Sequence, residues 1–283
     1  MLARRIPTIL PDMTIDEMLE VTKIYSIVGL TSKEMPLISN RPFRSPHHTV
    51  TPVSLVGGGK NPKPGEISLA HNGVLFLDEL PEFNRNSLEV LRGPLEDRKI
   101  TISRLNSTIT YPCNFMFIAS MNPCPCGYFG SNEKECKCKP EQIKKYINKI
   151  SGPLLDRIDI HIEVSGIKFS KLQSDKKVEN SKEIKNRVNK ARKIQIERYK
   201  EYNIYSNAEL TPKLIEKFCK LDNSSKIILE KAFKKLELSP RAYGRILKVA
   251  RTIADLEEQY QISQKHLAEA IQYRSLDRKY WQN

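Results

Sequence analysis

Three short segments in the first part of the chain predict buried strands of one parallel sheet. The first is Gly73-Val-Leu-Phe-Leu77, which ends in two acids, and the others are residues 115–119 and 158–164. Apolar runs of this length, bounded by polar residues, fit strands that are buried in a parallel sheet. Helical segments lie between them, so the pattern indicates an α/β layer.

The segments between these runs predict two helices, a hairpin and an irregular insertion. A capping-box pattern at Thr14 begins a helix that ends near Tyr25, and residues 86–96 form a second helix that a Gly-Pro pair interrupts. Residues 99–111 alternate around a turn and predict a β-hairpin. The segment 36–66 contains six prolines and four glycines, so we expect a long irregular insertion there.

The last third of the chain has a purely helical pattern. A polar stretch at residues 173–180 is typical of a linker, and apolar residues at helical spacing follow it. Thr211, Ser239 and Ser263 each provide an N-cap, and the first two precede a proline at the first helical position. We therefore expect four helices with short connections after the linker.

Composition excludes several classes of protein. With 283 residues, 39% hydrophobic and 28% charged, the chain has room for two domains and is not largely disordered. We expect an α/β core over residues 1–166 and an all-helical domain over residues 181–283. No apolar run reaches the roughly 18–20 residues of a membrane span, and the N-terminus lacks a signal-peptide pattern. A cytoplasmic location with six reduced cysteines is the expectation.

Positive charge is concentrated in the helical part. Residues 1–167 carry 20 basic and 18 acidic side chains, a net charge of +2, whereas residues 168–283 carry 27 and 15, a net charge of +12. Such an excess indicates a polyanionic partner, with nucleic acid first. The alternative is compositional, because Lys, Ile and Asn are abundant throughout the chain.

The first candidate site is the pair of carboxylates that ends the first strand, Asp78 and Glu79. Ligands of open α/β sheets bind at the carboxyl ends of the strands. An Asp there can hold a hydrated Mg²⁺, and a Glu beside it can activate a water for attack on a phosphate. Acids also end many structural strands, so this pair alone does not establish a site.

Other residues stand at matching places: Asn122 after the second strand, Arg157 before the third, and Arg241 in the first turn of a helix. Around them lie four long motifs: RPFRSPHHT (41–49), PGEISLAHNGVLFLDE (64–79), SGPLLDRID (151–159) and ARTIAD (250–255). These motifs closely resemble those of the magnesium-chelatase-like AAA+ ATPases of the YifB/ComM type, and the resemblance covers nearly the whole chain. It implies an AAA+ parallel-sheet core, incomplete at its N-terminus, followed by an all-helical lid.

The resemblance also implies a role for each candidate residue. Asp78 and Glu79 match the Walker B pair, which coordinates Mg²⁺ and activates water, and Asn122 matches the polar residue called sensor 1. Arg157 matches the arginine finger that completes a neighbouring subunit's ATP site in a ring, expected to be a hexamer. Arg241 matches sensor 2, which reports the nucleotide state from the lid. Without the resemblance, surface ion pairing would be the preferred interpretation of both arginines.

One motif of the family is missing. The phosphate-binding loop G-x-x-x-x-G-K-[ST] does not occur, because in the GGGK of residues 57–60 the first glycine is misplaced and Asn61 replaces the Ser or Thr. We therefore expect a portion of a longer protein that starts after this loop and lacks the family's N-terminal Lon-protease-like domain. Tight ATP binding by this chain alone is not expected, since the loop's amides and lysine cradle the phosphates.

Four cysteines form the second candidate site. Cys124, Cys126, Cys136 and Cys138 form two C-x-C pairs within fifteen residues, and four thiolates are the ligand set of a closed structural Zn²⁺ site. Each pair is tighter than the usual C-x₂₋₄-C spacing. The alternative is four free thiols on a loop, which is less favourable because exposed thiols are reactive.

The third candidate site is the hairpin at 99–111, with Arg98, Lys99 and Arg104 on its flanks. Its position before the second strand matches the pre-sensor hairpin of this AAA+ clade, which in ring motors can point into the pore and grip DNA. Basic side chains there would bind phosphates without reading sequence. A solvated sheet edge is the alternative.

These features favour part of an AAA+ ring ATPase, an ATP hydrolase of helicase type that uses Mg²⁺ and remodels DNA, as in branch migration during transformation. This chain alone would be deficient in ATP hydrolysis. One rival is a non-hydrolysing nucleic-acid-binding or regulatory fragment, which the missing phosphate-binding loop favours. The other is the motor subunit of a tetrapyrrole metal chelatase, although the cysteine-rich insert and residues 41–49 fit the YifB/ComM branch better.

Overall fold

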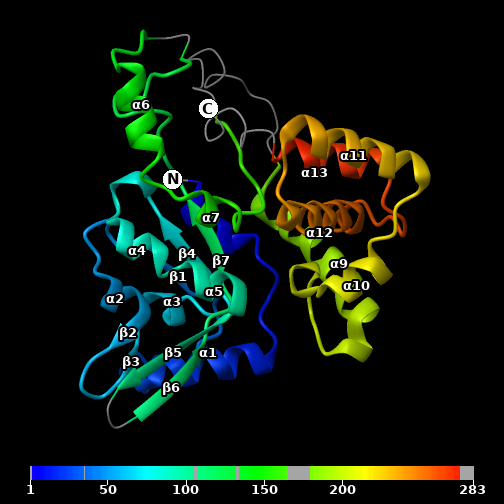
Figure 1. The fold of residues 1–283 in the computed structure, drawn as a ribbon. Helices are drawn as coiled ribbons and strands as arrows, with labels where there is room; N and C mark the ends of the chain where they lie inside the picture. The colour runs from blue at the N-terminus through cyan, green and yellow to red at the C-terminus, as the bar shows by residue number, and fades with distance from the viewer. Residues whose placement is uncertain (1, 35, 105–106, 132–133, 165–178, 275–283) are drawn as a thin grey trace. The chain divides into compact units, whose positions relative to one another are not determined.

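The computed structural model of the chain divides into two compact units, unit 1 (Met1–Arg157) and unit 2 (Ile158–Asn283) (Figure 1). The residues that it describes are 2–34, 36–104, 107–131, 134–164 and 179–274. Unit 1 contains a parallel sheet with helices, and unit 2 is helical. The expected fold class, an AAA+-type α/β core followed by a helical lid, is therefore confirmed. Most of the expected linker at 173–180 lies outside the described residues.

The sheet of unit 1 has three parallel strands in the order β1-β4-β7. The middle strand is β4 (Val74–Leu77), with β1 (Phe43–Arg44) on one side and β7 (Met116–Ala119) on the other. Three of the four residues of β4 are buried, as expected for a central parallel strand. Leu77 pairs with Ala119, so the carboxyl ends of β4 and β7 lie at the same edge of the sheet.

The strand predicted at residues 158–164 is wrong. These residues contain no strand, and the third strand of the sheet is β1, inside the segment predicted to be irregular. The backbone of 158–164 bonds instead to the end of the helical unit: the His161 N–H donates to the Tyr273 carbonyl at 2.9 Å, and Arg274 donates to the Ile158 carbonyl. The segment 158–164 therefore has no sheet neighbour among the described residues.

Both helices predicted for unit 1 are present, but one of them is interrupted earlier than predicted. α1 (Ile15–Ile27) begins at the predicted capping box, in which the side chains of Thr14 and Glu17 each accept the other's backbone N–H. The helix predicted at 86–96 is divided into α4 (Arg85–Glu89) and α5 (Arg92–Asp97), so the break precedes the Gly-Pro pair. The proline lies in the first turn of α5, where a missing N–H is tolerated. Further helices of unit 1 are the 3-10 helices Ala3–Thr8 and Leu80–Glu82, α2 (Pro52–Val56), α3 (Glu66–Leu69), α6 (Pro140–Ile147) and α7 (Gly152–Leu155).

The half-buried Arg41 and the buried His71 connect α1 to the segments that flank the sheet strands. Arg41 forms an ion pair with Glu17 at 3.0 Å, in addition to hydrogen bonds to backbone carbonyls. His71 Nε2 lies 3.0 Å from a carboxylate oxygen of Glu20, and His71 Nδ1 accepts the Asn114 N–H at 3.0 Å. Burial lowers the pKa of His71 below its ordinary value, although Glu20 opposes the shift.

Unit 1 also contains two antiparallel hairpins. One pairs β2 (Gly57–Gly58) with β3 (Lys63–Pro64), and the other pairs β5 (Lys99–Arg104) with β6 (Ser107–Pro112). The predicted hairpin is thus confirmed, and its turn, residues 105–106, lies outside the described residues. Both hairpins lie at the end of unit 1 that is opposite α6 (Figure 1).

Unit 2 has five α-helices among its described residues, one more than predicted. Thr211, Ser239 and Ser263 are N-caps as predicted, and the additional helix begins after Asp222, whose side chain accepts the Ser225 N–H. Its α-helices are α9 (Ser181–Tyr199), α10 (Pro212–Phe218), α11 (Asn223–Leu236), α12 (Pro240–Leu256) and α13 (Gln264–Gln272), with 3-10 helices at Lys200–Tyr202 and Asn207–Glu209. None of the described helices combines the length and the apolar character needed to cross a bilayer.

The core of unit 2 contains a buried group of charged and polar side chains. Asp255 is fully buried and pairs with Arg198 at 2.5 Å and with Arg251 at 3.2 Å. The Asn207 amide donates to the same carboxylate at 2.8 Å, and Tyr199 donates to the Asn207 oxygen at 2.6 Å. Every oxygen of the Asp255 carboxylate is thereby satisfied, as a buried charge requires.

Candidate functional site

Asp78 and Glu79 follow β4 directly at the carboxyl edge of the sheet, and both side chains are exposed. Ser120, the residue after β7, donates its hydroxyl hydrogen to Asp78 Oδ1, and the Glu79 N–H donates to the same oxygen at 3.2 Å. Asp78 is therefore oriented by two donors, while the Glu79 carboxylate stays open to solvent. Oxygen donors of this kind are the ligands that Mg²⁺ prefers, so the residues present fit a hydrated magnesium ion.

The backbone fixes where Glu79 points. Glu79 has a left-handed conformation, with φ 55° and ψ 51°, and it caps the short helix Leu80–Glu82. The Leu80 N–H donates to the Ser120 carbonyl at 2.9 Å, and the Ser120 N–H donates to the Leu77 carbonyl at 3.0 Å. The parallel ladder thus continues past the strands and holds the turn that carries both acids.

Asn122 lies two residues beyond Ser120 on the chain that leaves β7, and it is exposed. It therefore belongs to the same edge of the sheet as Asp78 and Glu79, as the sequence predicted. The chain then continues directly into the four-cysteine segment.

Arg157 lies at the end of unit 1, just after α7, and its side chain is only 8% exposed. Its guanidinium pairs with Glu96 of α5 and donates to the Pro153 carbonyl at 2.7 Å. The Glu96 side chain is 53% exposed. In this state the arginine is held inside its own chain by a partner that solvent can reach.

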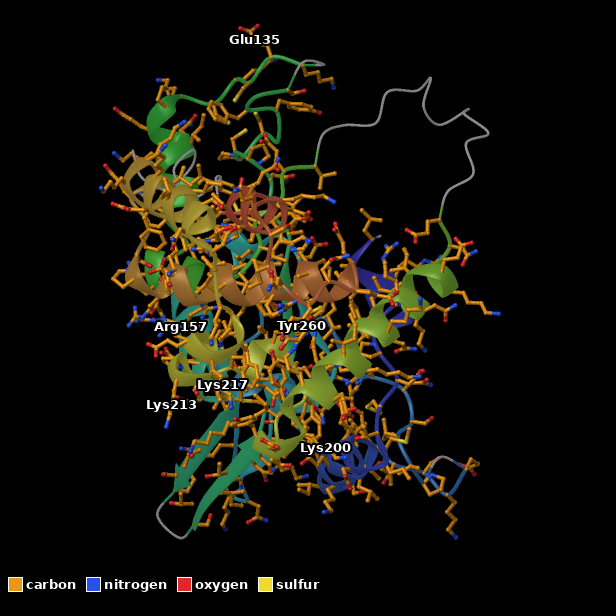
Figure 2. All side chains as sticks on the ribbon, turned by 90° about the vertical axis from the view of Figure 1, so that its right-hand side faces the viewer. Glu135, Arg157, Lys200, Lys213, Lys217 and Tyr260 are labelled. Atoms are coloured by element: carbon orange, nitrogen blue, oxygen red, sulfur yellow. The ribbon has the colours of Figure 1, made fainter. Side chains whose placement is uncertain are left out.

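Arg241 belongs to unit 2, in the first turn of α12, and is exposed. Other exposed basic residues of this unit include Lys200, Lys213 and Lys217, which Figure 2 labels. Lys217 Nζ also lies 5.0 Å from the centre of the Tyr202 ring. The positive charge predicted for this part of the chain is thus presented to solvent at these residues.

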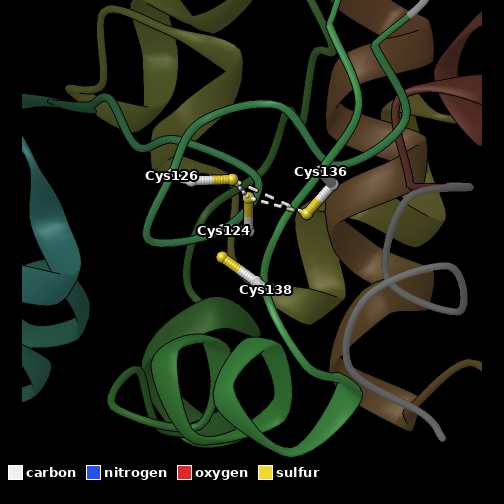
Figure 3. A group of neighbouring side chains, drawn as sticks. All are labelled: Cys124, Cys126, Cys136 and Cys138. Atoms are coloured by element: carbon white, nitrogen blue, oxygen red, sulfur yellow. Dashed lines mark hydrogen bonds between the residues drawn. The ribbon is translucent and has the colours of Figure 1, made fainter.

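The four cysteines converge as the sequence predicted (Figure 3). The Sγ–Sγ distances are 3.4 Å from Cys124 to Cys126, 3.7 Å from Cys124 to Cys136 and 3.6 Å from Cys126 to Cys136. All four Sγ atoms, including that of Cys138, lie within 4.8 Å of one another. Tetrahedral Zn–S bonds of about 2.3 Å would separate the sulfurs by roughly 3.8 Å. The cluster therefore has the geometry of a four-thiolate metal site and could hold a metal.

The thiols also have uneven pKa values, as expected for close groups that compete for protons. The pKa of Cys126 is lowered to about 6, foremost by the backbone N–H of Tyr128. The backbone of Cys138 lowers the pKa of Cys136, but burial and the neighbouring thiols outweigh it and raise that pKa to about 12. Four thiolates at this spacing repel one another unless a cation binds them.

The three candidate residues at the hairpin, Arg98, Lys99 and Arg104, do not lie on one face. Side chains alternate between the faces of a strand, so Arg104 shares a face with Ile100 and Ile102, which are buried. Lys99 is exposed on the opposite face, at the base of the hairpin. Arg98 ends α5 in a left-handed conformation, and its carbonyl accepts the Cys113 N–H at 2.9 Å.

Sequence reasoning missed two residues of the site, Ser120 and Glu96. Ser120 could have been found, because it follows an apolar strand that is parallel to the one before Asp78. Glu96 precedes Arg157 by 61 positions, and no local pattern joins them.

Comparison with known proteins agrees with this architecture. Residues 1–172 match the family profile of magnesium chelatase, subunit ChlI, and residues 178–274 match that of the ChlI C-terminal part. The chain is 48% identical to competence protein ComM of Haemophilus influenzae, over 98% of this chain and 53% of that protein. It is 45% identical to YifB of Escherichia coli, over 98% and 54% respectively.

A more distant relative is the magnesium-chelatase subunit ChlI of Chlamydomonas reinhardtii, which is 22% identical over 58% of this chain and 35% of that protein. The chain spans about half the length of ComM and YifB. On these matches the chain belongs to the magnesium chelatase ChlI family, and within it to the ComM and YifB type.

Proposed function

We propose that this chain is part of an AAA+ ring ATPase, assembled as a hexamer, that couples ATP hydrolysis to DNA remodelling such as branch migration during transformation. The observation that carries the proposal is the carboxyl edge of β4 and β7. There Asp78 is oriented by Ser120 while the Glu79 carboxylate is exposed. In such an arrangement one carboxylate can bind a cation, and the other can accept a proton.

Each residue at this edge has a distinct task in the proposed site. When bound, Mg-ATP supplies the phosphoryl group and the charge of the cation. Asp78 would contribute a ligand oxygen to that cation, and Glu79 would accept a proton from the attacking water. Asn122 would orient this water through its amide, and Arg241 would have the sensor 2 role that the resemblance implies.

The Arg157–Glu96 pair suggests how hydrolysis depends on assembly. An arginine finger must leave its own chain to reach the nucleotide of a neighbour, where it stabilises charge in the transition state. Because Glu96 is half exposed, water can replace the guanidinium at modest free-energy cost. We propose that ring assembly draws Arg157 away from Glu96.

We further propose that the four cysteines hold a structural Zn²⁺. The cluster begins two residues after Asn122, and Cys138 immediately precedes the cap of α6. A closed four-thiolate site would fix the segment that carries Asn122 relative to α6. The metal would thus contribute order and take no part in hydrolysis.

DNA is the proposed partner, and the cytoplasm the proposed location. Support comes from the exposed basic residues of both units and from the relative that is named a competence protein. The motor subunit of a metal chelatase is the second candidate, since both family profiles carry that name. It is weaker because identity to ChlI is 22%, against 48% to ComM.

The test is a chimera in which this chain replaces the matching segment of Haemophilus influenzae ComM. We expect the chimera to hydrolyse ATP, whereas the isolated chain, whose sequence contains no G-x-x-x-x-G-K-[ST], should not. Glu79→Gln should lower turnover by about 100-fold or more, since general bases contribute at least that much, and should leave nucleotide binding intact. Glu82→Gln, three residues away and also exposed, is the matched control and should retain turnover.

Branch migration of labelled DNA by the chimera separates the candidates. ATP-dependent strand exchange that Glu79→Gln abolishes supports the proposed function. A chimera that binds DNA but neither hydrolyses ATP nor moves strands would favour the regulatory fragment instead. Turnover that DNA does not alter and that drives no strand exchange would favour the chelatase motor.

A further inference from the structure

The glycine-rich hairpin β2–β3 has no task in the site described so far. Its GGGK sequence is not a phosphate-binding loop, yet three consecutive glycines have positive φ angles of 103°, 155° and 100°. Such conformations favour glycine, so the structure requires these residues for a reason of shape. The reason lies in what the hairpin contacts.

The β2–β3 hairpin packs directly against the β5–β6 hairpin. A Cβ atom on Gly57 would lie 2.3 Å from the Lys63 carbonyl oxygen of its own hairpin and 2.9 Å from Ile102 Cδ1. A Cβ atom on Gly58 would lie 2.9 Å from Arg104 Nη2. The Tyr111 hydroxyl donates to the Pro62 carbonyl at 2.9 Å. The glycines therefore allow the two hairpins to lie in close contact, with the Arg104 guanidinium over Gly58.

Three cations lie on the segments that meet at this contact. Lys63 stands opposite Gly58 in the β2–β3 register, and opposite residues of an antiparallel pair carry their side chains on the same face. Lys63 is thus on the face of the hairpin that Arg104 covers. Lys60, in the connecting loop, is exposed, as are Lys63 and Arg104.

The group lacks neutralising acids. Residues 57–64 and 98–112 contain no Asp or Glu, and within the described part of the chain Lys60, Lys63 and Arg104 form no ion pair. Five other basic side chains in the described part of unit 1 do have carboxylate partners. These pairs are Arg41–Glu17, Arg44–Glu66, Arg92–Glu89, Lys149–Glu82 and Arg157–Glu96.

We infer that Lys60, Lys63 and Arg104 form one binding surface for the phosphates of a nucleic-acid strand, built by the two hairpins together. Lys99 is not part of this surface, because it lies on the opposite face of β5. Cations without base-reading partners bind phosphates independently of sequence. The inference rests on the proposed DNA role and deepens it. It adds the β2–β3 hairpin, which the sequence did not single out for binding, to the DNA contact proposed for the β5–β6 hairpin.

The test is fluorescence anisotropy of labelled oligo(dT) with the whole chain over a series of KCl concentrations. Each phosphate contact on a single strand contributes about 0.7 to the slope of log affinity against log salt. We expect Lys60→Ala/Lys63→Ala to make the slope shallower by up to about 1.4. Lys60→Arg/Lys63→Arg should restore it. The control Lys144→Ala/Lys145→Ala removes two exposed charges from α6, at the other end of unit 1, and should leave the slope unchanged.

Double-mutant cycles test whether the surface is one unit. Lys63→Ala and Arg104→Ala should be non-additive, because both side chains belong to the proposed phosphate-binding surface, whereas Lys63→Ala and Lys99→Ala should add. If Arg104→Ala alters the slope and the Lys60/Lys63 variant does not, the inference is wrong while DNA binding by the hairpin stands. If the unaltered chain binds no DNA even at low salt, the DNA contact of the proposed function fails too. Binding of an acidic peptide in preference to oligo(dT) would also overturn the inference.

Discussion

An arginine pairs with a carboxylate in each unit of the molecule, and the two pairs differ in one respect. Arg157 in unit 1 and Arg198 in unit 2 are both largely buried, with side chains 8% and 13% exposed. Their partners are unlike each other: Glu96 is 53% exposed, whereas Asp255 is fully buried and also binds Arg251 and Asn207.

The exposure of the carboxylate decides what each pair can do. A pair with one solvated member can open, because water replaces the lost partner, whereas opening a buried pair leaves an uncompensated charge. The Asp255 pairs therefore stabilise the core of the helical unit, whereas the Arg157–Glu96 pair of the α/β unit can open.

The sharpest test of this difference concerns Arg157. In the ring-forming chimera, Arg157→Ala should reduce ATP turnover by about 1,000-fold or more while nucleotide binding persists, as for other arginine fingers. Glu96→Gln opens the same pair but keeps the guanidinium, so it should retain most of the turnover. Steady-state ATPase rates and binding of a fluorescent nucleotide measure both. Equal losses in the two variants would show that the pair is structural.

Asp255→Ala should affect the stability of the fold, whereas Arg157→Ala should affect ATP turnover. Asp255→Ala leaves Arg198 and Arg251 buried without a carboxylate, so we expect the free energy of unfolding to fall by about 3–5 kcal/mol. Hydrogen exchange should rise in α9 and α12 and stay constant in unit 1. Glu230→Ala removes the exposed partner of Lys234 and serves as the control, with no measurable change. A mild effect of Asp255→Ala would contradict the assigned role of the buried pair.

The four cysteines provide a test inside unit 1. Purified chain should contain about one Zn²⁺ by elemental analysis, and Cys124→Ser should lose it. A chelator should then destabilise unit 1, by about 2.7 kcal/mol if the free metal had been at a hundredfold its Kd. Cys113→Ala, which alters a buried thiol away from the cluster, should keep the metal. Metal-free protein with four freely titratable thiols would refute the site.

The smallest effect is expected from pH. Because burial lowers the pKa of His71, the unfolded chain takes up the proton more readily than the folded one. The stability that the neutral ring contributes is present above about pH 6.5, the ordinary value, and is lost as the pH falls through the folded pKa. Unfolding of unit 1 should thus become easier by at most about 1.4 kcal/mol per pH unit in this window. His71→Asn should flatten the profile measured by urea unfolding.

Local patterns predicted the strands β4 and β7, the helix α1, the β5–β6 hairpin and the cysteine cluster, because their signals lie within a few residues. The apolar run before Asp78, the capping box at Thr14 and the paired cysteines all belong to this class. Strand β1 was missed because two residues among prolines have no strand pattern of their own, and their pairing with Val74 and Leu75 creates the strand.

Pairings between distant segments could not be predicted in the same way. Glu96 and Arg157 meet only through folding, and the segment 158–164 has a strand-like alternation whose backbone bonds lead to Tyr273 and Arg274. The placement of Lys99 and Arg104 on opposite faces of β5, by contrast, could have been predicted. Their separation by five positions already implies opposite faces, so this information was in the sequence.

The left-handed backbone at Glu79 implies that this glutamate lowers the stability of the fold while it serves the proposed activity. A non-glycine residue in this region costs roughly 1–2 kcal/mol, and asparagine tolerates it better than glutamate. Glu79→Asn should therefore leave the fold as stable as before or slightly more stable, even though it removes the proposed base.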